Sequence, residues 1–256
     1  MPELPEAETI VRTLAPHIEG RSIQELRFLG PRAGQGAIPP LAGRRVRRVR
    51  RYGKQVLLEL DSGLLAIELR MTGSLRWRGV TGPYTRAVLR LDRGWICFDD
   101  IRQFGSIRWL GAPPDELGPD PLEINQNEFL ERVRGRQAQV KRLLLDQRFL
   151  RGIGNIYSDE ILFQAGIHPC TPASRLTAER ARRLHQAMAD VLGRAIAAGG
   201  SSISDYVDAN GRPGEFQNSH QVYGRLSRPC PRCGRSVRRI VVAQRGTHYC
   251  PACQKY

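Results

Sequence analysis

The stretch CPRCGRSVRRIVVAQRGTHYCPAC, residues 230–253, decides the fold of the C-terminal part of the chain. It holds one Cys-x2-Cys pair, Cys230 and Cys233, and a second, Cys250 and Cys253, with sixteen residues between them. Each pair can place two thiolates on one tight turn, and two such turns close a tetrahedral shell around zinc. No βαβ pattern surrounds the pairs, which argues against a thioredoxin-like redox site. We therefore expect one structural Zn²⁺ ion.

The residues between the pairs predict a β-hairpin. Apolar residues at 237 and 240–242 are typical of a strand, Gln-Arg-Gly at 244–246 of a turn, and His-Tyr at 248–249 of the returning strand. We expect Arg245 at or near the tip. A hairpin this small has no core of its own, so metal binding supplies its folding energy.

The composition indicates a globular protein with an anionic partner. The 256 residues carry a net charge of +15, and only three of the 40 basic residues are lysine: Lys54, Lys141 and Lys255. This length suits one large domain or two ordinary ones, and 41% hydrophobic residues argue against wholesale disorder. So positive a charge favours a polyanion, most simply nucleic acid, although a solubility surface is an alternative.

The basic residues are concentrated in two blocks. Residues 43–54 hold seven bases and residues 216–256 hold eight, and neither block contains an acid. Blocks of one sign are typical of phosphate-facing surfaces, and the planar fork of arginine suits phosphate oxygens.

The chain shows no targeting or membrane signal. Its first residues are acids and prolines rather than a basic region before an apolar run, and its apolar runs are too short to cross a bilayer. We expect a cytoplasmic protein that is not secreted. In a reducing cytosol neither remaining cysteine is a disulfide candidate: Cys97 lies in an apolar strand and should be core, and Cys170 receives no role.

The first 110 residues predict one helix followed by short strands. Pro5 and the acids beside it are typical of a helix start, and apolar residues from 7 to 18 have helical spacing. Pro16 should end or kink this helix near Ala15. Residues 22–110 then predict short strands separated by turn signals, as in a sandwich or barrel, for example at 56–60, 64–69, 87–91, 95–98 and 106–110.

The later part of the chain predicts helices. Residues 111–121 contain four prolines and indicate a linker. Helices are expected at 127–134, 137–146, 155–165 and 177–198, and the polar, aperiodic residues 208–221 predict a long loop. We expect four parts: a β-rich domain over 1–112, a linker over 113–126, a helical domain over 127–221 and a zinc finger over 222–256. Basic blocks on two domains that flank a cleft would suit a clamp around a duplex.

Four segments, MPELPE at 1–6, GIGNIY at 152–157, AGIHP at 165–169 and QVYGR at 221–225, stand in a fixed order before the last cysteines. Over essentially the whole chain they resemble the formamidopyrimidine-DNA glycosylases, the Fpg/Nei family of base-excision repair. The resemblance implies an α+β fold of two domains. An N-terminal β-sandwich with an N-terminal helix would precede a helix–two-turn–helix domain with a β-hairpin zinc finger.

The start of the chain carries the chemistry that the resemblance implies. If Met1 is removed, Pro2 presents a secondary amine that can attack C1′ of a nucleotide and form an iminium (Schiff base). Glu3 can protonate the sugar ring oxygen, and Glu6 can move protons afterwards. The helix dipole favours the neutral amine whereas the two acids favour the ammonium, so the pKa of Pro2 stays open. From the residues alone, a capped helix with surface acids is the alternative.

Lys54 is a second candidate, because it is the only lysine among the first 140 residues and follows a turn. The resemblance implies that it contacts phosphate and takes part in catalysis; a solvated base is the alternative. The resemblance also implies that Met71, Arg102 and Phe104 fill the gap left by an extruded base. Core or surface packing is the alternative there, although a glycine near each favours loop tips.

The remaining implied contacts are with phosphates and the damaged base. Asn155 resembles a phosphate-binding residue of the two-turn segment, and Arg245 resembles the arginine of the zinc hairpin that grips phosphates beside the lesion and takes part in catalysis. Residues 208–221 correspond to a loop that folds over an oxidised purine. Two positions depart from the family: Gln103 replaces a common arginine, and Glu68 replaces a phosphate-contacting histidine. A carboxylate repels phosphate, so Glu68 puts that contact in doubt, although the neighbouring Arg70, often glycine in the family, could substitute.

The resemblance thus implies a monomeric, nucleoid-associated DNA glycosylase and AP lyase. It would remove 8-oxoguanine and formamidopyrimidines from duplex DNA and cut the strand at abasic sites by β,δ-elimination. Two alternatives stay open: a Nei-type glycosylase for oxidised pyrimidines, and a non-catalytic zinc protein that binds damaged DNA. The opposite-base preference is not determined by the sequence.

Overall fold

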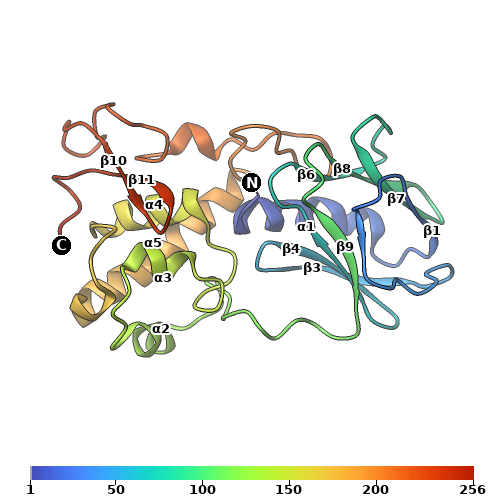
Figure 1. Cartoon of the computed structure of the whole chain (residues 1–256), viewed down its shortest axis with the longest axis horizontal. Coiled ribbons are helices and arrows are strands. Elements are labelled where there is room, and N and C mark those ends of the chain that lie inside the picture. Colours follow the sequence, from blue (N-terminus) through green and yellow to red (C-terminus); the bar gives the residue numbers. More distant parts are fainter. Residues whose placement is uncertain (1) are drawn as a thin grey trace. The chain divides into compact units, whose positions relative to one another are not determined.

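The computed structural model describes residues 2–256, which form two compact units (Figure 1). The first unit runs to Asp115 and includes Ile196–Gln217; the second comprises Glu116–Ala195 and Asn218–Tyr256. The segment Ile196–Gln217, which we expected in the helical domain, thus belongs to the N-terminal unit. Ala209 explains this placement, because it is fully buried in the core of that unit and its carbonyl accepts the Trp77 N–H at 2.8 Å.

The first unit begins with helix α1, Leu4–Ile18. Pro5 stands in its first turn, where a missing N–H costs nothing, and a capping box links Glu3 and Glu6. Pro16 does not end the helix near Ala15, one of the two predicted outcomes, because α1 continues through Pro16 for two more residues. Ile18 is fully buried, and the Glu19 N–H still donates to the Ala15 carbonyl at 3.0 Å, so packing holds the last turn.

Two sheets follow, and their inner faces share one core. The first has the order β2-β9-β5-β4-β3 and the second the order β1-β7-β8-β6, antiparallel except for the β2–β9 pair. Apolar side chains of both sheets and of α1 form one buried cluster, which confirms the predicted sandwich with its N-terminal helix. The strands are β1 (Ile23–Phe28), β2 (Gly34–Gln35), β3 (Val46–Tyr52), β4 (Gln55–Leu60), β5 (Leu64–Glu68), β6 (Gly73–Trp77), β7 (Thr85–Leu91), β8 (Trp95–Asp100) and β9 (Ser106–Leu110).

Strand β3 lies within the first basic block. Val46, Val49 and Tyr52 are buried, because a strand turns alternate positions toward the core. Several arginines of the block bind the protein itself. Arg51 pairs with Glu8 at 2.9 Å, and Arg50 pairs with a glutamate on β4. Part of the charge that we assigned to phosphate therefore stabilises the sandwich.

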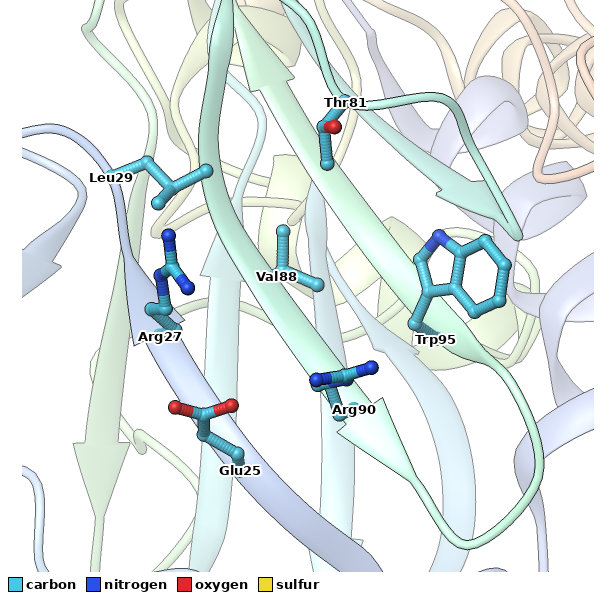
Figure 2. A pocket seen from close by; sticks show the side chains of 7 residues that line it. All are labelled: Glu25, Arg27, Leu29, Thr81, Val88, Arg90 and Trp95. Carbon is cyan, nitrogen blue, oxygen red and sulfur yellow. The ribbon is translucent and has the colours of Figure 1, made fainter.

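The outer face of the four-stranded sheet carries a pocket of about 340 Å³. Figure 2 shows Glu25 and Arg27 on β1, Val88 and Arg90 on β7 and Trp95 on β8 facing it. None of the expected site residues lines this pocket, so it is separate from the candidate site.

The second unit is built around helix α4, Asn155–Ala165, whose predicted bounds are those of the structure. Nearly all of α4 is buried, and it ends at Gly166 in the left-handed conformation (φ +67°). The hairpin β10–β11 packs beside it (Figure 1). The other elements are α2 (Gln126–Val133), α3 (Val140–Leu145), α5 (Ala178–Ala197, which reaches into the first unit), the 3₁₀ turns Ala173–Arg175 and Phe216–Ser219, and the strands β10 (Arg238–Val242) and β11 (Arg245–Tyr249).

Membrane insertion finds no support in the helices. Among residues 2–256, no helix is both long enough and apolar enough to cross a bilayer.

Candidate active site and nucleic-acid interface

Two buried carboxylates lie at the start of α1. Glu3 is 2% exposed and Glu6 is 1% exposed, and the Glu3 N–H donates to Glu6 Oε2 at 2.7 Å. Pro2, directly before them, is also buried. Met1, whose removal the expected chemistry requires, lies outside the described residues. The sequence-predicted residues Pro2, Glu3 and Glu6 are thus together at one helix terminus, and the two acids are not ordinary surface groups.

Sequence reasoning missed the segment that holds Glu6. The Ser201 N–H donates to Glu6 Oε1 at 2.7 Å, and the Tyr206 hydroxyl donates to the Glu6 carbonyl at 3.3 Å. Burial and the nearby Glu6 carboxylate raise the pKa of Tyr206, so its hydroxyl stays a donor. Gly200 lies against the same carboxylate, since a Cβ there would stand 2.8 Å from Glu6 Oε1. Gly199 and Gly200 directly follow the helix predicted at 177–198, and no local sequence pattern connects them with Glu6.

Lys54 lies in the two-residue turn that joins β3 to β4. Tyr52 pairs with Gln55 across this hairpin, and Gly53 takes the positive φ of +60° that the turn requires. The side chain of Lys54 is half-buried rather than fully solvated. The tight turn therefore fixes the backbone of the expected phosphate contact.

The three expected gap-filling residues lie together. The Arg102 guanidinium stands 4.7 Å from the centroid of the Phe104 ring, and its Nη1 donates to the sulfur of Met71 at 3.0 Å. Met71 is 44% exposed and Phe104 is 50% exposed, so neither is a core residue. Two loops, one after β5 and one after β8, thus present an apolar pair with a guanidinium between.

A buried aspartate, also missed from the sequence, organises these loops. Asp100 is fully buried, and its carboxylate accepts the Gly105 N–H at 2.8 Å and the Arg102 N–H at 3.2 Å. The Thr72 hydroxyl donates to the same carboxylate and accepts the Arg102 N–H at 3.1 Å. Because Thr72 follows Met71 directly, Asp100 and Thr72 tie the two loops to one another.

In the second unit, Asn155 joins the first turn of α4 to the zinc hairpin. Its Nδ2 donates to the Gly246 carbonyl at 3.0 Å, and its Oδ1 accepts Lys141 Nζ at 2.8 Å. Gly246 follows Arg245, so the two expected phosphate contacts of this unit come from adjoining segments. An amide has two N–H groups, which leaves one on Asn155 for a phosphate.

Lys141, the second of the three lysines, is fully buried and pairs with the equally buried Asp159. Asp159 Oδ2 also accepts the His248 N–H of β11 at 2.8 Å. Glu160 accepts the backbone N–H groups of residues 221, 222 and 223 at 2.8–3.0 Å. Buried carboxylates of α4 thus dock both the hairpin and the segment that leads to it, a role that the helical pattern could not reveal.

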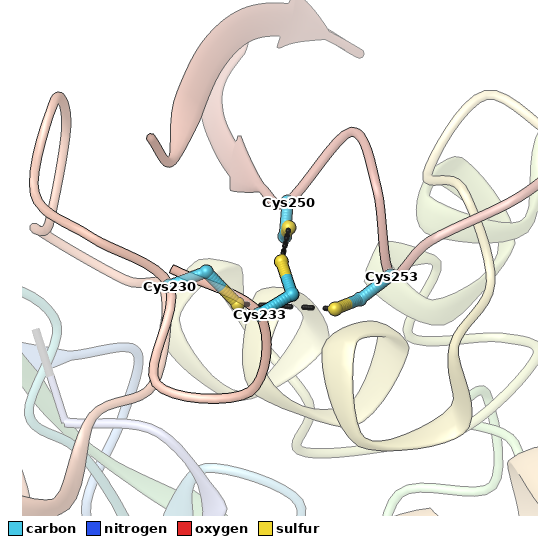
Figure 3. Close-up of side chains that lie close together, drawn as sticks. All are labelled: Cys230, Cys233, Cys250 and Cys253. Atoms are coloured by element: carbon cyan, nitrogen blue, oxygen red, sulfur yellow. Dashed lines mark hydrogen bonds between the residues drawn. The ribbon is translucent and has the colours of Figure 1, made fainter. Parts of the chain in front are cut away.

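Four thiols converge at the base of the hairpin (Figure 3), with all sulfurs within 4.8 Å of one another. Tetrahedral zinc with bonds of about 2.3 Å needs sulfur separations of about 3.8 Å; those of Cys230–Cys253 and Cys233–Cys250 are 3.9 and 3.5 Å. The Arg235 backbone N–H lowers the pKa of Cys233 to about 7, whereas burial and the neighbouring thiols raise that of Cys253 to about 12. Without a metal these thiols would not all ionise at the same pH. A bound cation favours the thiolate form of all four.

Arg245 begins β11 and pairs with Val242. The turn consists of Ala243 and Gln244, both with positive φ, one residue earlier than predicted. Arg245 is therefore next to the tip, as expected, and it is exposed. A two-residue hairpin turn needs left-handed backbone, which glycine adopts most easily. The Gln-Arg-Gly pattern therefore placed the turn at the glycine, one residue later than it lies.

Comparison with known proteins agrees with this arrangement. The formamidopyrimidine-DNA glycosylase N-terminal domain matches residues 1–107, its H2TH domain matches 117–207, and a zinc finger found in FPG and IleRS matches 227–255. A formamidopyrimidine-DNA glycosylase of Solibacter usitatus is 50% identical, with both chains fully covered. The crystal structure of the MutM (Fpg) protein from Thermus thermophilus superposes with a TM-score of 0.91 at 42% identity, covering 99% of this chain and 98% of that one.

A Lactococcus lactis FPG mutant in complex with Fapy-dG containing DNA superposes with a TM-score of 0.92 at 32% identity, with both chains fully covered. The fold, the zinc cluster and these matches define a zinc-containing DNA glycosylase. The chain belongs to the formamidopyrimidine-DNA glycosylase (Fpg/MutM) family, and a single structural zinc ion completes its C-terminal finger.

Proposed function

We propose that the protein is a bifunctional DNA glycosylase and AP lyase that acts through the N-terminal amine of Pro2. The observation that carries the proposal is the buried pair Glu3 and Glu6 directly after Pro2, linked by a hydrogen bond of 2.7 Å. Acids that serve only as surface caps need no such burial. Carboxylates in so dry a site suit proton transfer during base excision.

The proposed reaction begins after removal of Met1. The nitrogen lone pair of Pro2 attacks C1′, the bond from C1′ to the base breaks, and the base departs with a proton. Glu3 protonates the ring oxygen as the sugar opens, which gives an iminium between Pro2 and C1′. Loss of a C2′ proton then expels the 3′ phosphate, and a second elimination expels the 5′ phosphate. Glu6 carries protons during these later steps.

The other site residues are proposed to hold the DNA. Lys54 and Arg245 grip phosphates beside the reacting sugar and thereby assist catalysis, and Asn155 offers its remaining amide N–H to a phosphate. Met71, Arg102 and Phe104 fill the gap left in the duplex by the extruded base, since an exposed apolar pair can stack between bases. Zinc keeps Arg245 in place through the hairpin and takes no part in the bond changes.

Oxidised purines, 8-oxoguanine and formamidopyrimidines, are the proposed substrates, in duplex DNA bound by one copy of the chain. Two mutants of one relative, the Lactococcus lactis FPG, were crystallised with Fapy-dG containing DNA, which supports a purine-derived lesion over an oxidised pyrimidine. Residues 208–221 remain the proposed recognition loop. Its first part is well anchored, because the Ala209 N–H donates to the Thr13 hydroxyl at 3.2 Å.

Borohydride trapping tests the proposal. An 8-oxoguanine duplex is incubated with the protein and borohydride, which reduces an iminium to a stable covalent adduct. We expect an adduct with the wild type, loss of the adduct with Pro2→Gly, and loss when Met1 is retained. An undiminished adduct with Pro2→Gly would disprove the role of Pro2. Salt-sensitive binding without any adduct or strand cleavage would instead favour a non-catalytic DNA-binding protein.

A further inference from the structure

Arg70 combines an unfavourable backbone with an exposed side chain. Its φ is +53°, in the left-handed region that a residue with a Cβ rarely adopts, and its side chain is 58% exposed. Burial therefore does not explain why a long side chain occupies this position. Arg78 shares both properties, so Arg70 is distinguished by its place in the loop that presents Met71 and by the contacts of its guanidinium.

Glu68 holds the guanidinium of Arg70. Both Nε and Nη2 of Arg70 lie 2.8 Å from Glu68 Oε2, so one edge of the fork is fixed. The other carboxylate oxygen, Oε1, accepts Gln55 Nε2 at 2.7 Å and Arg108 Nη2 at 3.4 Å. Glu68 is thus fixed from three strands or loops, and it fixes Arg70 in turn.

The cluster is cationic in sum. One carboxylate, Glu68, stands between two guanidiniums, those of Arg70 and Arg108, which leaves one positive charge. Glu68 therefore presents no isolated negative charge to a phosphate, as the sequence alone suggested it would. Gln55 follows Lys54 and pairs with Glu68 across β4 and β5, so the cluster lies at the same end of the sheet as Lys54.

We propose that Arg70 binds a DNA phosphate through the part of its guanidinium that faces away from Glu68, and that Glu68 is the positioning residue. A guanidinium held on one edge loses little side-chain entropy when its remaining N–H groups meet phosphate oxygens. The inference rests on the proposed DNA-binding function. It adds a contact to the loop of Met71.

Salt-dependent binding of a duplex with a tetrahydrofuran abasic-site analogue tests this contact. Removal of one phosphate contact should lower affinity about tenfold and reduce the slope of log affinity against log salt by about 1. We expect both effects with Arg70→Gly, and partial recovery with Arg70→Lys. Arg78→Gly is the matched control, because Arg78 is also exposed with a positive φ of +49°. It should leave the slope unchanged.

The variant Glu68→Gln tests whether Glu68 positions Arg70 or instead repels the DNA phosphate. If Glu68 positions Arg70, the variant binds DNA more weakly, and the effect disappears in an Arg70→Gly background. Higher affinity of Glu68→Gln would overturn the positioning role, and equal slopes for Arg70→Gly, Arg78→Gly and the wild type would overturn the phosphate contact. Failure of the wild type to bind the duplex or form the borohydride adduct would refute the proposed function itself.

Discussion

Gly200 provides the sharpest test of the N-terminal site. A Cβ at this position would lie 2.8 Å from Glu6 Oε1, 3.0 Å from its Cγ and 3.2 Å from its Cδ. Real contacts of this kind begin at about 3.4 Å, so the carboxylate would have to move by about 0.6 Å. It has no free direction, because one oxygen accepts the Ser201 N–H and the other the Glu3 N–H, each at 2.7 Å.

We therefore expect Gly200→Ala to lose stability and activity together. The left-handed backbone (φ +82°) costs alanine about 1–2 kcal/mol, and breaking a hydrogen bond to a buried carboxylate costs about 1.5–3 kcal/mol. The free energy of unfolding should fall by about 2.5–5 kcal/mol. Displacement of Glu6 should lower the single-turnover rate of strand cleavage roughly 10- to 100-fold, as misplacements near 1 Å do.

Gly43→Ala is the control for this experiment. Gly43 has almost the same φ, +83°, but a Cβ there meets no atom within 4 Å. It should cost only the backbone term of about 1–2 kcal/mol and leave the rate unchanged. Urea unfolding and single-turnover cleavage of an 8-oxoguanine duplex measure the two quantities. Equal losses in both variants, with full activity in Gly200→Ala, would refute the reasoning that Gly200 makes room for Glu6.

Three further predictions concern other parts of the molecule. Cys250→Ser should reduce bound zinc, measured by atomic absorption, and weaken DNA binding at least tenfold, because the small core of the finger cannot fold without metal. The control Cys170→Ser should retain one zinc ion per chain. Burial lowers the pKa of His220 to about 4, so as the pH falls the unfolded state gains a proton at this residue before the folded state does. The free energy of unfolding should therefore fall by about 2 kcal/mol between pH 7 and pH 5. A difference in unfolding free energy between the wild type and His220→Gln that does not depend on pH would contradict this. Asp100→Asn should lower the excision rate about tenfold, since Asp100 orders the loops of Met71 and Phe104, which are proposed to fill the gap. Borohydride trapping on a preformed abasic site should change less. Equal losses in both assays would show general misfolding instead.

Much of the architecture followed from local patterns. Cysteine spacing predicted the zinc site, turn signals separated the strands, and helical spacing located α4 at its observed bounds. Strand β3 lies within the range predicted to form short strands, but its arginines concealed the alternation of Val46, Val49 and Tyr52, so its bounds were not predicted. The end of α1 was also misplaced, because burial of Ile18 outweighs the local effect of Pro16.

The sequence by itself determined the chemistry available at the site: a proline followed by two acids, an isolated lysine in a turn, and four thiols with zinc spacing. Only the tertiary structure decided which groups support them. Gly200 and Ser201 meet Glu6 across almost two hundred residues of chain, Asp100 ties together two loops, and Lys141 is buried against Asp159 beneath Asn155. Such contacts depend on packing between elements distant in the chain, and local residue patterns contain no record of that packing.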